Sequence, residues 1–162
     1  MTHQVLYSPQ LQERYEAEDR LRVFFNRQVE TDTAPYRSRY DQLTVQKIVQ
    51  CLSLCRDDSV LDLGCGDGWF CRILSPLCPE GSIVGLDISD STVRRAREQS
   101  VSFENILYTP GTAEEIPWAE DYFARVVALE SAYYWPSPEN AVQEVFRVMK
   151  SGGEIFLLLS LY

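Results

Sequence analysis

Residues 60–68, with the sequence VLDLGCGDG, constrain the fold of this chain more than any other stretch. A short apolar run ends at Asp62 and Leu63, glycines follow at three alternate positions, and residues 69–74 then have the pattern of a helix. Glycine has no Cβ and tolerates a positive φ, so the turn can be tight and its N–H groups can face a bound molecule. The stretch therefore predicts a strand, a tight turn and a helix arranged around a ligand.

Composition is that of an ordinary soluble domain. The 162 residues, of which 45% are hydrophobic and 24% charged, fit a single globular domain. No apolar run approaches the roughly 20 residues that cross a bilayer, and the N-terminal residues, rich in Gln, Glu and Arg, do not resemble a secretory signal. We therefore expect a cytoplasmic protein without a membrane span.

Charge and cysteine content argue against two further classes of protein. The net charge of -9 is unsuited to nucleic acid, because neutralising phosphates requires clustered lysines and arginines. The arginines at 94, 95 and 97 are best explained as a solvated helix face, so we expect no nucleic-acid partner. The five cysteines are odd in number and lack the paired spacing of a metal site. We expect reduced thiols and no metal.

The chain alternates between helical and strand patterns. Apolar residues at helical spacing predict one or two helices within residues 1–30, outside the sheet, and a further helix over residues 41–54. Strands are expected at 59–63, 82–87, 106–108, 124–129 and 154–161, with helices at 68–74, 90–99 and about 138–149.

Strands that alternate with helices form βαβ units with right-handed crossovers. We therefore expect an α/β fold with a doubly wound, mostly parallel sheet. Residues 1–40 are expected to form a helical cap or lid, and residues 41–162 the sheet domain.

The glycine loop differs from the two best-known phosphate-binding loops. The dinucleotide fingerprint requires glycine where Trp69 stands, and the P-loop requires a Gly-Lys-Ser/Thr end that this loop lacks. The ligand expected is therefore a nucleoside without phosphates. Asp87 ends the next predicted strand, beside the loop, where its carboxylate can accept both hydroxyls of a ribose. Asp87 could instead cap the following helix, although Ser89 or Asp90 suits that role better.

Four segments in order carry a family resemblance. They are residues 60–68, 85–89 (GLDIS), 111–118 (GTAEEIPW) and 148–153 (VMKSGG). Together they resemble the successive motifs of class I S-adenosylmethionine-dependent methyltransferases, of the small-molecule type that includes ubiquinone and sterol methyltransferases. The resemblance extends from about residue 40 to the end of the chain. It implies a Rossmann-like fold, S-adenosylmethionine as cofactor and S-adenosylhomocysteine as product.

The resemblance also implies a cofactor site. Its expected residues are Asp62, Gly64, Cys65, Gly66 and Leu129 at the methionine part, Asp87 at the ribose, Ile88, Thr112 and Ala113 at the adenine, and Tyr36 and Tyr40 from the N-terminal segment. In this scheme Asp62 anchors the loop and reaches the amino group, and Leu129 offers a carbonyl to the ammonium.

Residues after the fourth predicted strand are best placed for the methyl acceptor. Methyl transfer from a sulfonium needs alignment and exclusion of water, and it needs a base only for a hydroxyl or an acidic carbon. Glu130 could be such a base or could neutralise a cation, and Tyr133, Tyr134 and Trp135 could wall an apolar pocket. Alternatively, the aromatic residues cap the core and Glu130 bonds to loop amides. We take Glu130 and Tyr134 as the candidate catalytic residues.

Residues 154–161 predict a long, flat, apolar strand. The family's sheet ordinarily continues through another helix and two more strands, so the C-terminal strands are expected to be missing from this sequence. The last strand would then lie at an edge, which favours a homo-oligomer or a partner that covers it.

The function expected is methyl transfer from S-adenosylmethionine to a small or lipid-like acceptor by in-line displacement. The alternative is a non-catalytic subunit, similar to a methyltransferase, that binds the cofactor or a partner. A nicotinamide-dependent oxidoreductase ranks third, because it needs glycine where Trp69 stands.

Overall fold

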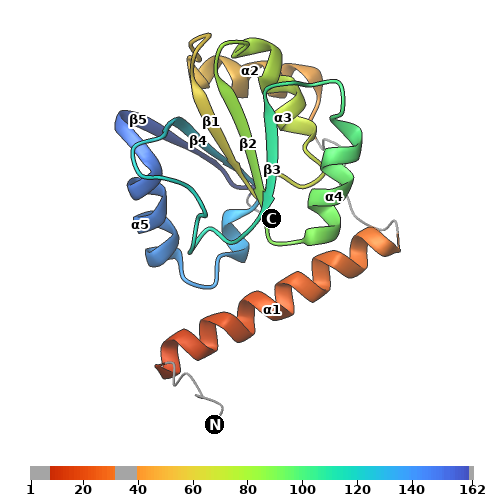
Figure 1. Ribbon diagram of the computed structural model, residues 1–162, viewed down its shortest axis with the longest axis vertical. Coiled ribbons are helices and arrows are strands. Elements are labelled where there is room, and N and C mark those ends of the chain that lie inside the picture. The colour runs from red at the N-terminus through yellow and green to blue at the C-terminus, as the bar shows by residue number, and fades with distance from the viewer. Residues whose placement is uncertain (1–7, 32–39, 161–162) are drawn as a thin grey trace.

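The computed structural model describes residues 8–31 and 40–160. Figure 1 shows a central sheet with helices on both faces and one long helix across its lower end. The helices are α1 (Pro9–Glu30), α2 (Gln42–Leu52), α3 (Trp69–Leu74), α4 (Asp90–Gln99) and α5 (Pro138–Val148), with short 3-10 turns η1 (Ser75–Leu77) and η2 (Ala132–Tyr134). The strands are β1 (Ser59–Leu63), β2 (Ser82–Asp87), β3 (Ile106–Pro110), β4 (Phe123–Leu129) and β5 (Met149–Leu158).

The described sheet is parallel throughout, with the strand order β3-β2-β1-β4-β5. The chain first moves outward from β1 through β2 to β3 and then crosses back to β4 and β5, which is the doubly wound arrangement. The expected α/β fold is therefore confirmed. The crossover creates a switch point at the carboxyl end of β1, between β2 and β4.

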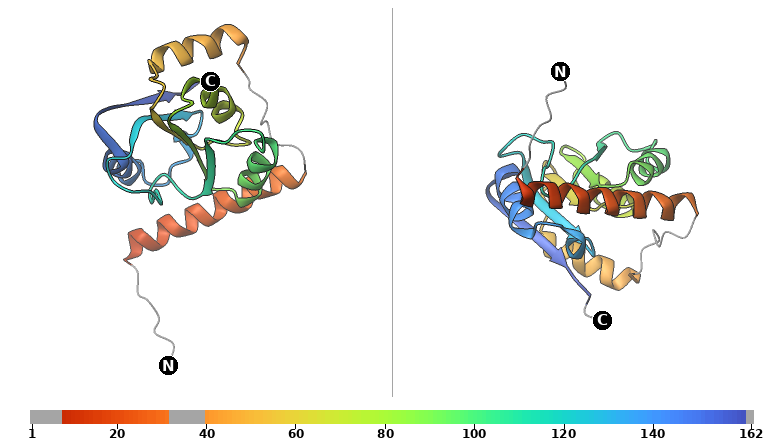
Figure 2. Two further views of the ribbon diagram at one scale, coloured as in Figure 1. Left: turned by 45° about the horizontal axis from the view of Figure 1, so that its top comes forward. Right: turned by 90° about the horizontal axis from the view of Figure 1, so that it is seen from below.

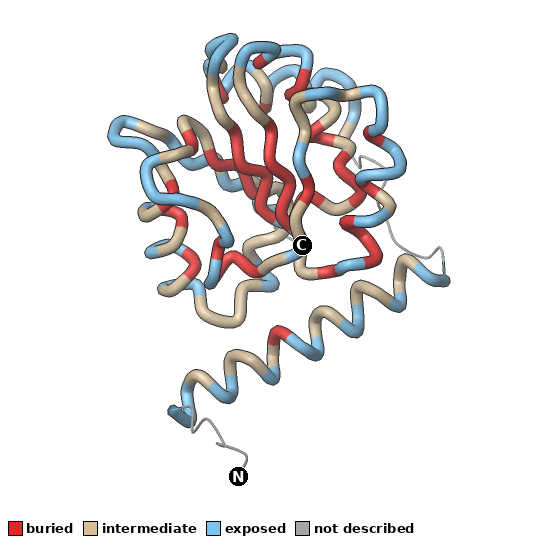
Figure 3. Tube along the Cα trace, viewed as in Figure 1, coloured by how far each residue is buried: buried red, intermediate tan, exposed pale blue. Residues whose placement is uncertain are grey.

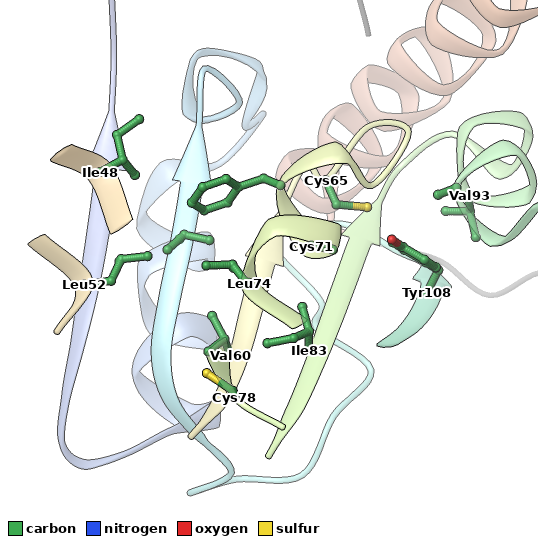
Figure 4. Close-up of a cluster of buried hydrophobic side chains, with 13 residues drawn as sticks. Ile48, Leu52, Val60, Cys65, Cys71, Leu74, Cys78, Ile83, Val93 and Tyr108 are labelled. Carbon is green, nitrogen blue, oxygen red and sulfur yellow. The ribbon is translucent and has the colours of Figure 1, made fainter. Parts of the chain in front are cut away.

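Two apolar clusters hold the helices against the sheet. One joins β1, β2 and β4 to α2, α3 and α4 through residues such as Val60, Ile83 and Leu74, and most of its members are drawn in Figure 4. The other packs α5 against the opposite face through Leu61 and Val126 among others. Figure 3 shows this burial concentrated in the central strands, while most of α1 is exposed or half-buried.

Local side-chain bonds explain why helices begin where they do. Asp41 accepts the amide of Thr44 at 2.7 Å at the start of α2, and Ser89 accepts that of Thr92 at 3.1 Å at the start of α4. Such caps satisfy amides that have no partner within the helix. Ser89, and not Asp87, caps α4 with its side chain, which leaves Asp87 available for a different role.

The last strand begins earlier than the sequence pattern predicts. The expected start at Glu154 is wrong: β5 begins at Met149, which pairs with Phe123, and a register irregularity follows before Arg125 pairs with Glu154. Gly152 has a φ of 79° within this stretch. Residues 151–153, a Ser-Gly-Gly sequence typical of a turn, therefore lie inside an irregular strand. The described strand ends at Leu158.

Helix α1 is a single helix that lies across the carboxyl ends of the strands, as Figure 1 and the view from below in Figure 2 both show. Asn26 accepts the hydroxyl of Ser89 at 2.7 Å and the amide of Ser91 at 3.2 Å, which joins α1 to the start of α4. At its other end, Arg14 lies 3.1 Å from Glu18 and 3.5 Å from Glu115. These polar contacts fix α1 at the sheet edge where parallel α/β proteins bind ligands.

Candidate cofactor and acceptor site

A cavity of about 570 Å³ lies at the carboxyl edge of the sheet. It is bounded by the glycine loop after β1, the tip of β2, residues 111–114, residues 129–136 and one side of α1. The strand registers explain why these segments meet. Leu63 pairs with Leu86, and Asp62 pairs with Val127, so Gly64, Asp87 and Leu129 reach the same level of the sheet edge.

The glycine loop has a left-handed backbone, with φ of 76° at Gly64, 56° at Gly66 and 76° at Gly68. A Cβ at Gly64 would collide with the side chain of Ser131, whose hydroxyl donates to the carbonyl of Leu63 at 2.6 Å. Glycine is therefore required at position 64 both by conformation and by close packing.

The amides of this loop are used within the protein. Those of Gly64 and Cys65 donate to the carbonyl of Leu86 at 2.7 and 3.0 Å, and that of Gly66 donates to Asp87 Oδ2 at 3.0 Å. The expectation that these N–H groups face a ligand is wrong for all three. Gly64 and Gly66 line the cavity without a side chain beyond the Cα atom.

Asp87 lies at the centre of the site. Its Oδ1 accepts the amide of Ser89 at 2.9 Å while Oδ2 accepts that of Gly66, so it is fixed on both sides. Burial raises the pKa of this carboxyl to about 6, although both hydrogen bonds act in the opposite direction. Each carboxylate oxygen has two lone pairs, so Asp87 can still accept hydroxyls from the cavity.

Asp62 lies beneath the loop and does not line the cavity. It is 3% exposed and accepts the thiol of Cys71 at 3.2 Å. Burial raises the pKa of Asp62 to about 7, the bond from Cys71 opposes this shift, and the nearby Asp87 adds to it. The structure therefore places Asp62 in the core beside Cys71 of α3, on the strand that leads into the glycine loop.

The structure brings most of the expected site residues to one cavity. Its lining includes Gly64, Cys65, Gly66, Asp87, Ile88, Thr112, Ala113, Leu129, Tyr40, Glu130 and Tyr134. Tyr36 lies outside the described residues. Lining residues that the sequence did not single out for the cofactor include Trp69 and, from α1, Leu21, Phe24, Phe25 and Gln28.

The apolar stripe on α1 was the available signal for these residues. Leu21, Phe24 and Phe25 have helical spacing, which is equally typical of ordinary core packing. Phe24 remains 51% exposed, and Phe25 makes an edge contact with Tyr134 at a centroid distance of 5.2 Å. The stripe therefore borders the cavity and is not part of either apolar cluster of the sheet.

Glu130 follows β4 with a left-handed backbone, φ 56°, which is uncommon for a residue with a Cβ. Its carboxylate accepts hydroxyls from Tyr40 at 3.1 Å, Tyr133 at 2.7 Å and Ser160 at 2.5 Å. Partial burial raises the pKa of Glu130, but the bonds from Ser160, Tyr133 and Tyr40 together lower it below its ordinary value. The side chain bonds to three hydroxyls and also to the backbone of Ser160, so the alternative of bonds to loop amides describes part of its contacts.

Known proteins share both the sequence pattern and the fold. A family model described as a methyltransferase domain matches residues 61–157. The chain is 34% identical over 111 residues to the uncharacterized methyltransferase YcgJ of Bacillus subtilis, covering 67% of this chain and 43% of that protein. It is 32% identical over 99 residues to 2-methyl-6-phytyl-1,4-hydroquinone methyltransferase 1 of rice, covering 61% of this chain and 30% of the relative.

The crystal structure of Bacillus subtilis YcgJ superimposes with a TM-score of 0.67 at 27% identity, over 72% of this chain and 50% of that one. A second neighbour, an S-adenosylmethionine-dependent methyltransferase from Aquifex aeolicus, has a TM-score of 0.68 at 20% identity and shares the fold, over 77% of this chain and 67% of that one. The chain spans less than half the length of the curated relatives named above.

Within the described residues, no helix combines the length and hydropathy of a membrane span. The matched family model covers more than half of the chain, and it includes the glycine loop, the tip of β2 and strand β4, which ends at Leu129. This chain belongs to the methyltransferase domain family.

Proposed function

We propose that the cavity at the carboxyl edge binds S-adenosylmethionine and that the protein transfers its methyl group to a small or lipid-like acceptor. The observation that carries this proposal is the position of Asp87, half-buried beside a left-handed glycine loop, with each carboxylate oxygen accepting a backbone amide. A carboxylate at this edge is suited to the two hydroxyls of a ribose.

The other lining residues fit the remaining parts of the cofactor. Gly64 and Gly66 line the part of the cavity where the methionine chain would lie. Ile88 and Ala113 offer apolar contacts to an adenine ring, and Thr112 lies beside them. Leu129 would offer its carbonyl to the ammonium group, while Asp62 supports the loop from below.

The cofactor supplies an activated methyl group on a sulfonium, and the protein's task is to align the acceptor and exclude water. Helix α1 covers this edge and would act as the cap of the site, with residues 1–40 as the cap segment and residues 41–162 as the cofactor domain. Phe24, Phe25 and Tyr134 give the cavity an apolar wall. An apolar or aromatic acceptor suits this wall, and relatives named for hydroquinone and demethylmenaquinone methylation support the same class.

A non-catalytic cofactor-binding subunit is the second candidate. It is kept as a candidate because the matched segments cover only 43% of YcgJ and 30% of the rice relative. Purified protein incubated with S-adenosylmethionine and a panel of hydroquinone, amine and thiol acceptors separates the two. Methylated product supports the enzyme, whereas cofactor binding without product across the panel supports the subunit.

Calorimetric titration with S-adenosylmethionine and S-adenosylhomocysteine, up to millimolar concentration, tests the cofactor. We expect saturable binding of both, and no heat for either would overturn the proposal. Thermal unfolding in the presence of NAD provides the comparison, because a ligand at 100 times its dissociation constant stabilises by about 2.7 kcal/mol. Stabilisation by NAD alone would favour an oxidoreductase instead.

A further inference from the structure

A series of aromatic rings borders the cavity and is joined by one carboxylate. Trp69 and Tyr40 lie with ring centroids 6.1 Å apart, and Tyr133 and Tyr134 are 6.2 Å apart. The Phe25 contact with Tyr134 continues the series onto α1. All five residues line the cavity.

Glu130 connects the two halves of this series. Its Oε1 accepts the hydroxyl of Tyr40, from the segment before α2, and its Oε2 accepts the hydroxyl of Tyr133, from η2. The Tyr133 hydroxyl also lies 3.0 Å from the carbonyl of Ser160, and the Ser160 hydroxyl donates to Oε1. Three segments that are distant in sequence therefore meet at one side chain.

The backbone around Glu130 is fixed as firmly as its side chain. The amide of Glu130 donates to the carbonyl of Leu158 at 2.9 Å, which ties it to β5. The next residue, Ser131, is bonded to Leu63 beneath the glycine loop. A left-handed conformation at a residue with a Cβ persists only where the surroundings determine it, and here contacts on both sides do so.

A carboxylate in this position is poorly suited to accept a proton from an acceptor molecule. Oε1 already receives two hydroxyls and Oε2 receives one. Partial burial raises the pKa of this carboxyl, but these bonds stabilise the charged carboxylate and lower the pKa below its ordinary value, so it is a weak acceptor for a proton. What the bonds achieve is to hold two tyrosine rings at set positions on the cavity wall.

We propose that Glu130 is a positioning residue, which holds Tyr40 and Tyr133 in place around the cofactor's reactive end, and not a general base. The inference rests on the proposed function, because it assumes that the cavity holds the cofactor. The two roles of Glu130 predict different effects on cofactor affinity. A base acts on the acceptor only, whereas a positioning residue also affects cofactor affinity through Tyr40.

A double-mutant cycle on S-adenosylhomocysteine affinity tests this without any acceptor. Glu130→Gln and Tyr40→Phe should each weaken binding by about tenfold, which is about 1.4 kcal/mol, and the double variant should be no weaker than the weaker single variant. The control is Tyr122→Phe, which removes a hydroxyl that lies 3.2 Å from Ser82, at the opposite end of the sheet. Its effect should simply add to that of Glu130→Gln.

Two results would overturn the inference. One is an unchanged dissociation constant for Glu130→Gln. The other is a double variant, Glu130→Gln with Tyr40→Phe, whose loss of binding free energy equals the sum of the two single losses, as is expected for the Tyr122→Phe control. If Glu130→Gln does not fold, Tyr40→Phe alone decides, because it removes one hydroxyl and leaves the carboxylate in place; unchanged binding would then contradict the role. Absence of binding by the wild-type protein is a separate outcome, which overturns the proposed cofactor and this inference together.

Discussion

Gly64 and Gly152 have almost the same backbone conformation but different surroundings. Their φ values are 76° and 79°, yet a Cβ at Gly64 would collide with Ser131, while nothing lies within 4 Å of a Cβ at Gly152. A left-handed conformation costs an L-residue roughly 1–2 kcal/mol. Comparing the two positions therefore separates the free-energy cost of the left-handed conformation from the cost of the steric clash at position 64.

Gly64→Ala should lower the free energy of unfolding by more than Gly152→Ala, with roughly 1–2 kcal/mol expected for the latter from conformation alone. Only Gly64→Ala should also abolish binding of S-adenosylhomocysteine, because Ser131 and the loop must shift. Urea denaturation and calorimetry measure the two effects. Equal losses of stability at the two positions would contradict the close packing described for Gly64.

Asp87 makes stability depend on pH in a direction that can be worked out. Burial raises its pKa to about 6 in the folded protein from an ordinary value of 3.8, so between these values the folded state binds more protons than the unfolded state. Stability from this group is therefore fully present below pH 4 and is lost as pH rises through 6. At 1.36 kcal/mol per unit the loss is on the order of 3 kcal/mol.

Asp87→Asn should remove this part of the pH dependence. Between pH 4 and 7 the free energy of unfolding of the wild type should fall relative to that of the variant, as followed by urea denaturation at each pH. Taking the difference cancels the groups whose titration the substitution leaves unchanged. Asp62 adds a smaller change of its own, because Asp87 contributes to its raised pKa. If the free energies of unfolding of the two proteins change in parallel with pH, the pKa of Asp87 is not raised in the folded protein.

Single positions differ in how far the sequence could predict them. Asp87 and the glycines were predictable because a strand end fixes where its next residue lies. The bonds of Glu130 were not, because its partners are 90 residues away at Tyr40 and 30 away at Ser160. The raised pKa of Asp62 likewise depends on burial by elements that no local pattern specifies.

Among the elements, α1 is held mainly by polar contacts at its ends and apolar contacts at the cavity. Its sequence predicted one or two helices within residues 1–30, because apolar residues recur at helical spacing. In the structure the side chain of Ser8 caps the helix that begins at Pro9. Its place across the sheet edge was not predictable, since the contacts of Asn26 with Ser89 and Ser91 join distant segments. The early start of β5 was missed for a similar reason, because pairing with Phe123 overrides the local glycines.

Asn26→Ala should loosen α1 by removing two hydrogen bonds to the start of α4, each worth about 1 kcal/mol. Hydrogen–deuterium exchange of residues 9–30 should become roughly 5- to 30-fold faster, while exchange in β1 and β2 stays unchanged. Gln12→Ala is the matched control, because Gln12 bonds only to the exposed Glu16 in the described contacts. Equal exchange in the two variants would mean that Asn26 does not hold the helix.

For the molecule as a whole, the described sheet leaves one side of β5 unpaired, since β5 pairs only with β4 among the described strands. Ile155 and Leu157 on this strand are 37% and 44% exposed. An exposed apolar edge favours pairing with a second copy or a partner.

We expect light scattering at micromolar concentration to give a mass above the 18.6 kDa of one chain. Leu157→Lys should shift the protein toward monomer, because an edge lysine opposes pairing. Val101→Lys is the control, since Val101 is 89% exposed and lies after α4. A monodisperse monomer for the wild type would contradict association through β5.

We propose that the whole carboxyl edge of the sheet serves as one cofactor site. A crystal structure of the protein with S-adenosylhomocysteine is the most direct test. We expect ribose hydroxyls within hydrogen-bond distance of Asp87, adenine against Ile88 and Ala113, and the sulfur facing the ring series joined by Glu130. A ligand bound elsewhere, or one whose ribose makes no contact with Asp87, would contradict it.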